Sequence, residues 1–168
     1  MLRHQYQYRS YQYAFTLIEM LAVIIVVGVL ASIAVPKFLD LQRSATIASM
    51  QGLQGALNSA VSLSFARSAA DGVQNEAMAT ITVNGQLIDV VYGFPAGTQS
   101  GIGTMVVSPS SDWQQRPSTH LGAYVYWPSR FDVDAWPAQC FIRYRQSTGV
   151  GNAPVIDFYT GSASGSGC

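Results

Sequence analysis

The chain has 168 residues, of which 49% are hydrophobic and only 11% are charged, and its formal net charge is zero. This length gives room for one modest domain in addition to an anchoring segment. Zero net charge does not support a basic surface for nucleic acid, so we do not expect nucleic acid as a primary partner.

The N-terminal residues 1–14 are polar and rich in tyrosine, and they end at Ala14. We predict that this stretch is a processing segment and exclude it from the fold. Its two arginines, Arg3 and Arg9, precede a long apolar stretch. Because positive residues stay on the cytoplasmic side, they favour a cytoplasmic N-terminus and an exported C-terminus.

Residues from Phe15 to Val35 form a nearly unbroken apolar stretch whose interior holds one carboxylate, Glu19. As a helix rising about 1.5 Å per residue, this stretch is roughly 30 Å long, which matches the hydrocarbon core of a bilayer. It is therefore predicted to span a membrane. Placing a carboxylate there costs on the order of 2.5 to 3.5 kcal/mol, so we expect Glu19 to have a partner or a function. The alternative is that Glu19 reaches the membrane interface.

An ordinary secretory signal is the other interpretation of this N-terminus. Its apolar core would be Met20 to Leu30, with a cut after Ala34. That interpretation leaves Glu19 unexplained, together with the helical pattern beyond Pro36.

Beyond Pro36 the pattern becomes amphipathic and predicts that one long helix continues from about Phe15 to Ala70. Pro36 should kink this helix, and Asp71-Gly72 should end it. Gly52 and Gly55 each cost roughly 1 kcal/mol in a helix, which suggests close packing against another backbone. The predicted buried stripe consists of Phe38, Leu41, Ile47, Met50, Leu53, Leu57, Val61 and Phe65.

After Ala79 the period becomes two, which predicts β-strands. Residues 80–92 read as a hairpin around Asn84-Gly85, and Gly93 to Gly97 should break it. Thr104 to Val107 fits either a strand or a helical turn, and Pro109 to Thr119 is predicted to be a polar loop. The other predicted strands are Ala123 to Trp127, Gln139 to Arg145 and Val155 to Tyr159.

Together these elements predict an α+β fold in which an antiparallel sheet of about four to six strands covers the helix stripe.

Two cysteines, Cys140 and Cys168, lie late in the chain. An even pair downstream of an export segment predicts a disulfide in an oxidising compartment. By the chain-entropy estimate, the bridge contributes roughly 3 to 4 kcal/mol. The alternative is a pair of unpaired structural thiols.

The N-terminal motif resembles that of type IV prepilins. The resemblance is carried by Phe15-Thr16-Leu17-Ile18-Glu19 and by the spacing from Phe15 to Gly28 and Pro36. It implies that a prepilin peptidase cuts between Ala14 and Phe15 and methylates the new amine of Phe15. The family normally has Gly before the cut, and this chain has Ala14.

Four further stretches resemble the mannose-sensitive haemagglutinin (MSHA) branch of the type IV pilins: residues 36–42, 53–57, 82–85 and 92–95. The resemblance implies a structural subunit and not an enzyme. We expect no cofactor and no bound metal, because the two cysteines are too far apart for a close-spaced zinc motif and His120 is the only histidine after the leader. Its partners would be copies of itself in a helical filament, the prepilin peptidase and an assembly platform in the inner membrane. It would wait in the inner membrane and then become part of an extracellular pilus used for surface adhesion.

The resemblance also implies an assembly role for Thr16, Glu19, Gly28 and Pro36. The carboxylate of Glu19 would meet the amine of Phe15, on its own or an adjacent subunit. The stretch from Gly28 to Pro36 would unwind locally in the filament, although a simple kink is the alternative. The same plan divides the chain into a leader (1–14), a membrane and assembly helix (15–36), an amphipathic helix half (37–72) and a β head (73–168).

Two other functions stay open. One is a pseudopilin of the type II secretion piston, and the other is a membrane-anchored periplasmic enzyme or binding protein that does not polymerise. Asp132 and Asp134 offer a weak calcium site, for which a solvated loop is the simpler interpretation. Five aromatic residues could offer a sugar-binding platform, but their alternation favours a plain core role for several of them. They are Trp113, Tyr124, Tyr126, Trp127 and Trp136.

Overall fold

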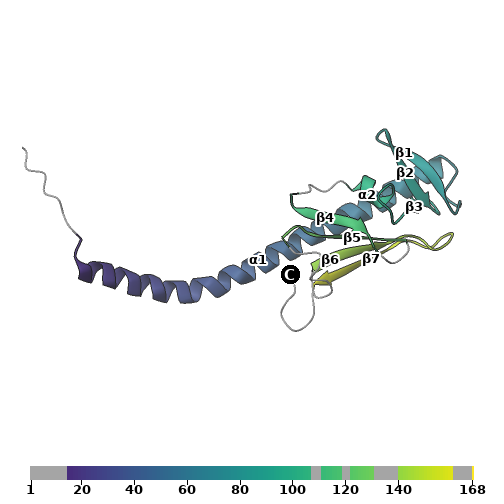
Figure 1. Ribbon diagram of the computed structural model, residues 1–168. Helices are drawn as coiled ribbons and strands as arrows, with labels where there is room; N and C mark the ends of the chain where they lie inside the picture. Colours follow the sequence, from purple (N-terminus) through teal and green to yellow (C-terminus); the bar gives the residue numbers. More distant parts are fainter. Residues whose placement is uncertain (1–14, 107–110, 119–121, 131–139, 161–167) are drawn as a thin grey trace, which may run out of the picture. The chain divides into compact units, whose positions relative to one another are not determined.

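The computed structural model describes residues 15–106, 111–118, 122–130, 140–160 and 168. The chain divides into two compact units, Met1–Leu41 and Gln42–Cys168. We call the second unit the head. Figure 1 shows one long helix, labelled α1, together with the strands of the head.

Helix α1 runs from Leu17 to Ala70 without interruption, which confirms the predicted helix and its end before Asp71-Gly72. It continues through Pro36, although proline has no amide hydrogen to donate to the carbonyl of Ser32. Every residue from 15 to 45 is exposed. Burial of the helix begins at Thr46, within the head.

The predicted stripe is right in the middle of the head helix, where Met50, Leu53 and Leu57 are buried. It is wrong at both ends. Phe38 and Leu41 are 60% and 68% exposed. At the other end the buried positions fall on small residues, because the helix approaches a backbone turn closely there. These small buried residues are Ala60, Ser64 and Ser68.

The head contains two antiparallel sheets, whereas the sequence predicted one. We call them sheet A, with strand order β1-β2-β3, and sheet B, with strand order β4-β5-β6-β7. A short helix, α2 (Ile102–Met105), separates them in the chain and decides the ambiguous stretch after Thr104 in favour of a helical turn. The strands are β1 Ala79–Val83, β2 Gln86–Val91, β3 Phe94–Pro95, β4 Trp113–Pro117, β5 Ala123–Pro128, β6 Cys140–Arg145 and β7 Val155–Thr160.

Strand β4 corrects the prediction of a polar loop over Pro109 to Thr119. Its sequence, WQQRP, shows little apolar alternation, because β4 is an edge strand in which Gln114 and Arg116 are exposed. Pro117 pairs with Tyr124 at the end of the strand, a position that tolerates proline.

Two tight turns build sheet A. Asn84 and Gly85 have φ values of 51° and 81°, as a type I′ turn requires, and Val83 pairs with Gln86 across it. The predicted hairpin is therefore confirmed. The break predicted at Gly93 is instead a second turn, where Tyr92 and Gly93 have φ values of 51° and 83° and join β2 to β3.

The second turn is fastened to α1. The hydroxyls of Ser64 and Ser68 both donate to the carbonyl of Gly93, at 3.2 and 3.1 Å. Next to them the ring of Phe65 stacks on Phe94, with centroids 4.9 Å apart. These buried positions hold serine because the buried carbonyl of Gly93 needs a hydrogen-bond donor, which an apolar side chain does not have.

The main core of the head lies between α1 and sheet B. Figure 1 shows the second half of α1 alongside these strands. The buried side chains come from the helix, from α2 and from one face of the sheet, and the disulfide between Cys140 and Cys168 lies among them. The core comprises Met50, Leu53, Leu57, Ala60, Ile102, Val106, Tyr124, Tyr126, Ile142 and Tyr144.

The disulfide confirms the predicted cysteine pairing. Cys140 is fully buried in β6, and Cys168 is 8% exposed, with its sulfur 3.7 Å from the sulfur of Met50. The amide of Cys168 also donates to the carbonyl of Thr160 at the end of β7. The last residue of the chain is therefore fixed to the helix and to sheet B.

Candidate assembly segment and surfaces

The first half of α1, together with Phe15 just before it, presents a long exposed apolar surface. Its large side chains are more than half exposed, from Phe15 at 73% to Leu41 at 68%. By length and composition this helix can cross a membrane, and none of its apolar window is buried. A surface of this size requires cover from lipid or from other protein.

Thr16 caps this helix. Its side-chain oxygen accepts a hydrogen bond of 3.3 Å from the backbone amide of Glu19, three residues later. Thr-x-x-Glu is the sequence of a capping box, in which the residue at the N-cap satisfies a free amide of the first turn. A carboxylate in that turn also interacts favourably with the helix dipole.

Glu19 is therefore placed one turn from the start of the apolar helix, with its side chain exposed. In the full 168-residue chain the nitrogen of Phe15 is a peptide nitrogen, so an amine at this position exists only after a cut before Phe15. Gly28 and Pro36 lie further along the same helix, which is continuous through both. Ala14 and the rest of the leader lie outside the described residues.

Gly52 and Gly55 do not pack against another backbone among the described residues. A β-carbon added at either would meet no atom within 4 Å, and both residues are exposed. The close packing predicted for them is therefore wrong within the single subunit.

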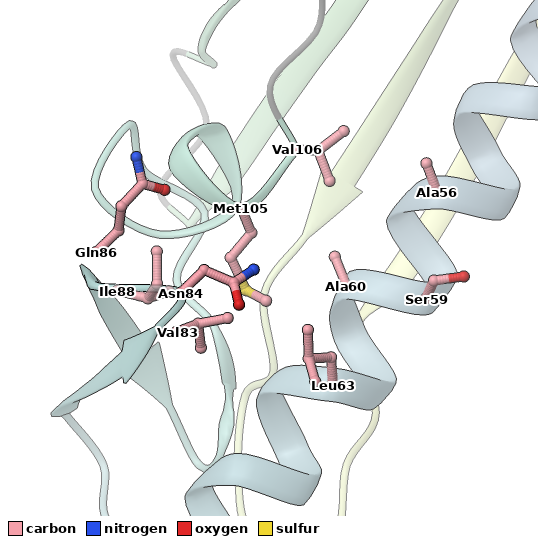
Figure 2. Close-up of a pocket in the computed structure, with 10 residues that line it drawn as sticks. All are labelled: Ala56, Ser59, Ala60, Leu63, Val83, Asn84, Gln86, Ile88, Met105 and Val106. Carbon is pink, nitrogen blue, oxygen red and sulfur yellow. The ribbon is translucent and has the colours of Figure 1, made fainter.

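A groove of about 380 Å³ opens between α1 and sheet A, next to α2. Figure 2 shows Ala60 and Leu63 on the helix side, with Val83 and Met105 facing them. None of its ten lining residues carries an ionisable group. The groove therefore offers van der Waals contacts and uncharged polar groups, but no charged acid or base.

The favoured core role is confirmed for the aromatic residues that the structure describes. Tyr124 and Tyr126 are fully buried in the core facing α1, and Trp113 packs half-buried against the same core. Trp127 belongs to the opposite face of sheet B. Trp136, Asp132 and Asp134 lie outside the described residues.

The core tyrosines connect the two sheets. The Tyr144 hydroxyl donates to the carbonyl of Pro95 in β3 at 2.6 Å, and the Tyr126 hydroxyl donates to the carbonyl of Ile102 at 3.2 Å. Tyr124 donates to the side chain of Gln99. Burial raises the pKa of all three phenols, and for Tyr126 the neighbouring tyrosines add to the increase.

On the other face of sheet B, Asp157 is held by two arginines. Arg143 and Arg145 approach the same carboxylate oxygen at 2.8 and 3.0 Å. Partial burial alone would raise the pKa of Asp157, but the hydrogen bonds and charges of the two arginines outweigh it and lower the pKa. Arg143 also donates to the hydroxyl of Tyr159.

Two comparisons with known proteins define the class. Residues 9–35 match the prokaryotic N-terminal methylation motif. The chain is 33% identical over 98 residues to the type IV narrow pilus major component PilA5 of Thermus thermophilus, which covers 58% of this chain and 72% of that protein. No solved structure was found to match.

The chain belongs to the type IV pilin family. Its long apolar helix, antiparallel sheets and C-terminal disulfide form the α+β fold of that family. It is a subunit of a type IV pilus, and family membership points to a structural protein and not to an enzyme. Membership also implies a pilus polymer, a prepilin peptidase and residence in a membrane before assembly.

Sequence reasoning missed the cap at Thr16 and the arginine pair at Asp157. The first had a signal, because Thr16 and Glu19 have the spacing of a capping box. The second had a weaker one: Arg143, Arg145 and Asp157 alternate along two predicted strands, but their pairing depends on the register between β6 and β7.

Proposed function

We propose that this chain is an MSHA-like pilin, a subunit whose filament attaches the cell to surfaces. The observation that carries the proposal is the contrast along α1. Residues 15–45 are all exposed, and 15–36 are almost wholly apolar, whereas the head has its own core. A helix of this kind suits first a bilayer and then a bundle of neighbouring helices.

The proposed maturation is a cut between Ala14 and Phe15, followed by methylation of the Phe15 amine. Before assembly the subunit waits in the inner membrane of a Gram-negative type of cell, N-terminus in and head out, and an assembly platform then extracts it. Residues 1–14 are the leader, 15–36 the membrane and assembly helix, 37–72 the amphipathic helix half and 73–168 the antiparallel β part that lies outside the membrane. We propose that the helix unwinds locally between Gly28 and Pro36 in the filament.

Glu19 is proposed to pair with the amine that the cut creates at Phe15, on the same or an adjacent subunit. A buried ion pair is not automatically stabilising, because desolvation can exceed the Coulomb attraction. Its value is register: a subunit inserted at the wrong height leaves a carboxylate without a partner in apolar surroundings. The cap from Thr16 supports this role, because it orders the turn that holds Glu19.

Glu19→Gln tests the proposal with little change of shape. We expect filaments on the cell surface to be lost while the head is still exported with its disulfide, since the substitution removes only the charge. Asp40→Asn is the matched control, because it neutralises an exposed carboxylate of the same helix beyond the apolar stretch. Electron microscopy scores filaments, and thiol alkylation scores export.

Unaltered filaments in Glu19→Gln would remove the proposed role. Wild-type cells with short periplasmic assemblies and no surface fibres would indicate a secretion pseudopilin, and monomers alone would indicate an anchored protein that does not polymerise.

A further inference from the structure

Three arginines lie on one face of sheet B, the face turned away from the core under α1. Arg116 pairs with Val125, and Val125 pairs with Arg143, so all three share a row across β4, β5 and β6. Arg145 follows Arg143 two residues along β6 and therefore lies on the same face. We call Arg116, Arg143 and Arg145 the arginine face.

The arginine face has an excess of positive charge. The four strands of sheet B contain three arginines but one carboxylate, Asp157. Asp157 is already shared by Arg143 and Arg145. The local excess is notable because the whole chain has a formal net charge of zero.

Two of the arginines are open to solvent. Arg116 is exposed on the edge strand β4, and the Arg145 side chain is 50% exposed. Neighbouring strands lie about 4.8 Å apart, so the backbones of Arg116 and Arg143, two strand spacings apart across β5, are about 10 Å from each other. Positive charges at this separation suit an extended polyanion better than a single small ion.

The aromatic rings on this face are already occupied. The guanidinium of Arg116 lies 5.5 Å from the centre of the Trp127 ring, and Trp127 is only 7% exposed. The ring of Tyr159 is stacked on Phe141, with ring centroids 4.2 Å apart, and it also contacts the guanidinium of Arg143. Single-stranded nucleic acids bind by stacking their bases on accessible aromatic rings. Because these rings are already in contact with other side chains, the arginine face does not suit such a ligand.

We infer that the arginine face binds a carboxylate-bearing polysaccharide. Guanidinium groups bind carboxylates through paired, charge-assisted hydrogen bonds, and Arg143 and Arg145 already show this chemistry with Asp157. The inference rests on the proposed adhesion function and adds the chemical class of the adhesive partner.

The test measures binding of the full-length protein, in non-ionic detergent, to immobilised alginate, a polyuronate. Neutral dextran and double-stranded DNA are the comparison surfaces. We expect alginate to be preferred over both and its binding to be lost at high ionic strength, because exposed charges are screened by salt. The double variant Arg116→Gln/Arg145→Gln should bind alginate at least about tenfold more weakly, which corresponds to a loss of about 1.4 kcal/mol of binding free energy. Arg143 is retained so that Asp157 keeps one of its two arginine partners when Arg145 is replaced.

Arg67→Gln is the matched control. Arg67 is an arginine of α1 with a side chain 49% exposed, and it pairs with Asp71 away from sheet B. Equal binding to dextran, stronger binding to DNA, or an equal loss in Arg67→Gln would each overturn the inference. Unfolding curves of the variants verify that the head is intact.

Alginate binding, taken together with electron microscopy of cells for filaments, separates this inference from the proposed function. A chain that binds alginate through these arginines but builds no filament would retain the inference and remove the pilus role. A chain that builds adhesive filaments without binding alginate would do the reverse.

Discussion

Thr16 and Glu19 occupy the two ends of one short motif at the start of α1. The cap connects a backbone amide to a side chain in the same turn that carries the assembly carboxylate. A motif that the family resemblance assigns to assembly thus also has a local structural role.

Thr16→Ala should fray this turn, because loss of an N-cap costs about 1 kcal/mol. We expect faster hydrogen exchange at the amide of Glu19 in the full-length protein, and Thr16→Ser should retain slow exchange because serine also caps. Equal exchange rates in all three proteins would show that the cap does not stabilise the first turn of α1.

Asp157 should make the head sensitive to acid. Its pKa is lower in the folded head than in the unfolded chain, so its contribution is present above the unfolded value and is lost as the pH falls through the folded one. Asp157→Asn should lower the free energy of unfolding by on the order of 1 to 2 kcal/mol at neutral pH.

Denaturant unfolding at a series of pH values checks this, and the deficit of Asp157→Asn should shrink as the pH falls below about 4. Asp71→Asn is the control, because its exposed pair with Arg67 on the helix surface is worth at most about 0.5 kcal/mol. A deficit that stays constant down to the lowest pH would contradict the ion-pair explanation.

At the scale of elements, the buried tyrosines join sheet B to the segments that precede it in the chain. Tyr144 donates from β6 to β3, and Tyr126 donates from β5 to α2. Each hydroxyl satisfies a backbone carbonyl that the head shields from water.

Tyr144→Phe should lower the free energy of unfolding by about 1 to 3 kcal/mol at neutral pH, because the Pro95 carbonyl loses its donor. Tyr92→Phe, at a half-buried tyrosine, should stay within about 0.5 kcal/mol of wild type. Equal effects at the two sites would show that the Tyr144 hydrogen bond contributes nothing measurable.

The same tyrosines predict an alkaline limit. Burial raises the pKa of Tyr126 and Tyr144, so the folded head holds these protons more tightly than the unfolded chain. Stability should therefore decline as the pH rises above about 10, where the unfolded phenols ionise. In Tyr144→Phe that decline should be shallower, which circular dichroism against pH would measure.

Local signals in the sequence predicted the elements better than their arrangement. The hairpin at Asn84-Gly85 and the end of α1 each depend on a few adjacent residues, and both were predicted correctly. Strand β4 was missed because an edge strand need not alternate. The division into two sheets was missed because it depends on pairing between strands distant in sequence.

The site shows the same limit. The cysteine pair and the apolar helix were predictable from residue type and spacing. The serines at 64 and 68 were not, because their burial depends on a carbonyl in the Tyr92-Gly93 turn. Gly52 and Gly55 are exposed and contact no other backbone in the described part of the subunit, so the close packing predicted for them is not found there.

At the scale of the whole molecule, the disulfide fastens the end of the chain to the core of the head. Reduction, or the double variant Cys140→Ser/Cys168→Ser, should lower the free energy of unfolding by roughly 3 to 4 kcal/mol, the value for a loop of this length. Tryptophan fluorescence in denaturant measures it, and an unchanged midpoint would contradict a stabilising role.

The whole molecule therefore combines an exposed apolar helix with a head that holds itself together. The helix is useful to a filament only if it is retained and if its first residue carries a free amine near Glu19. Everything proposed for assembly depends on where the mature chain begins.

The intact mass of the subunit purified from cells tests this most directly. We predict a chain that begins at Phe15 with one added methyl group and that retains the Cys140–Cys168 bridge. A mature chain that begins after Ala34 would lack the apolar helix, and that result would contradict the account.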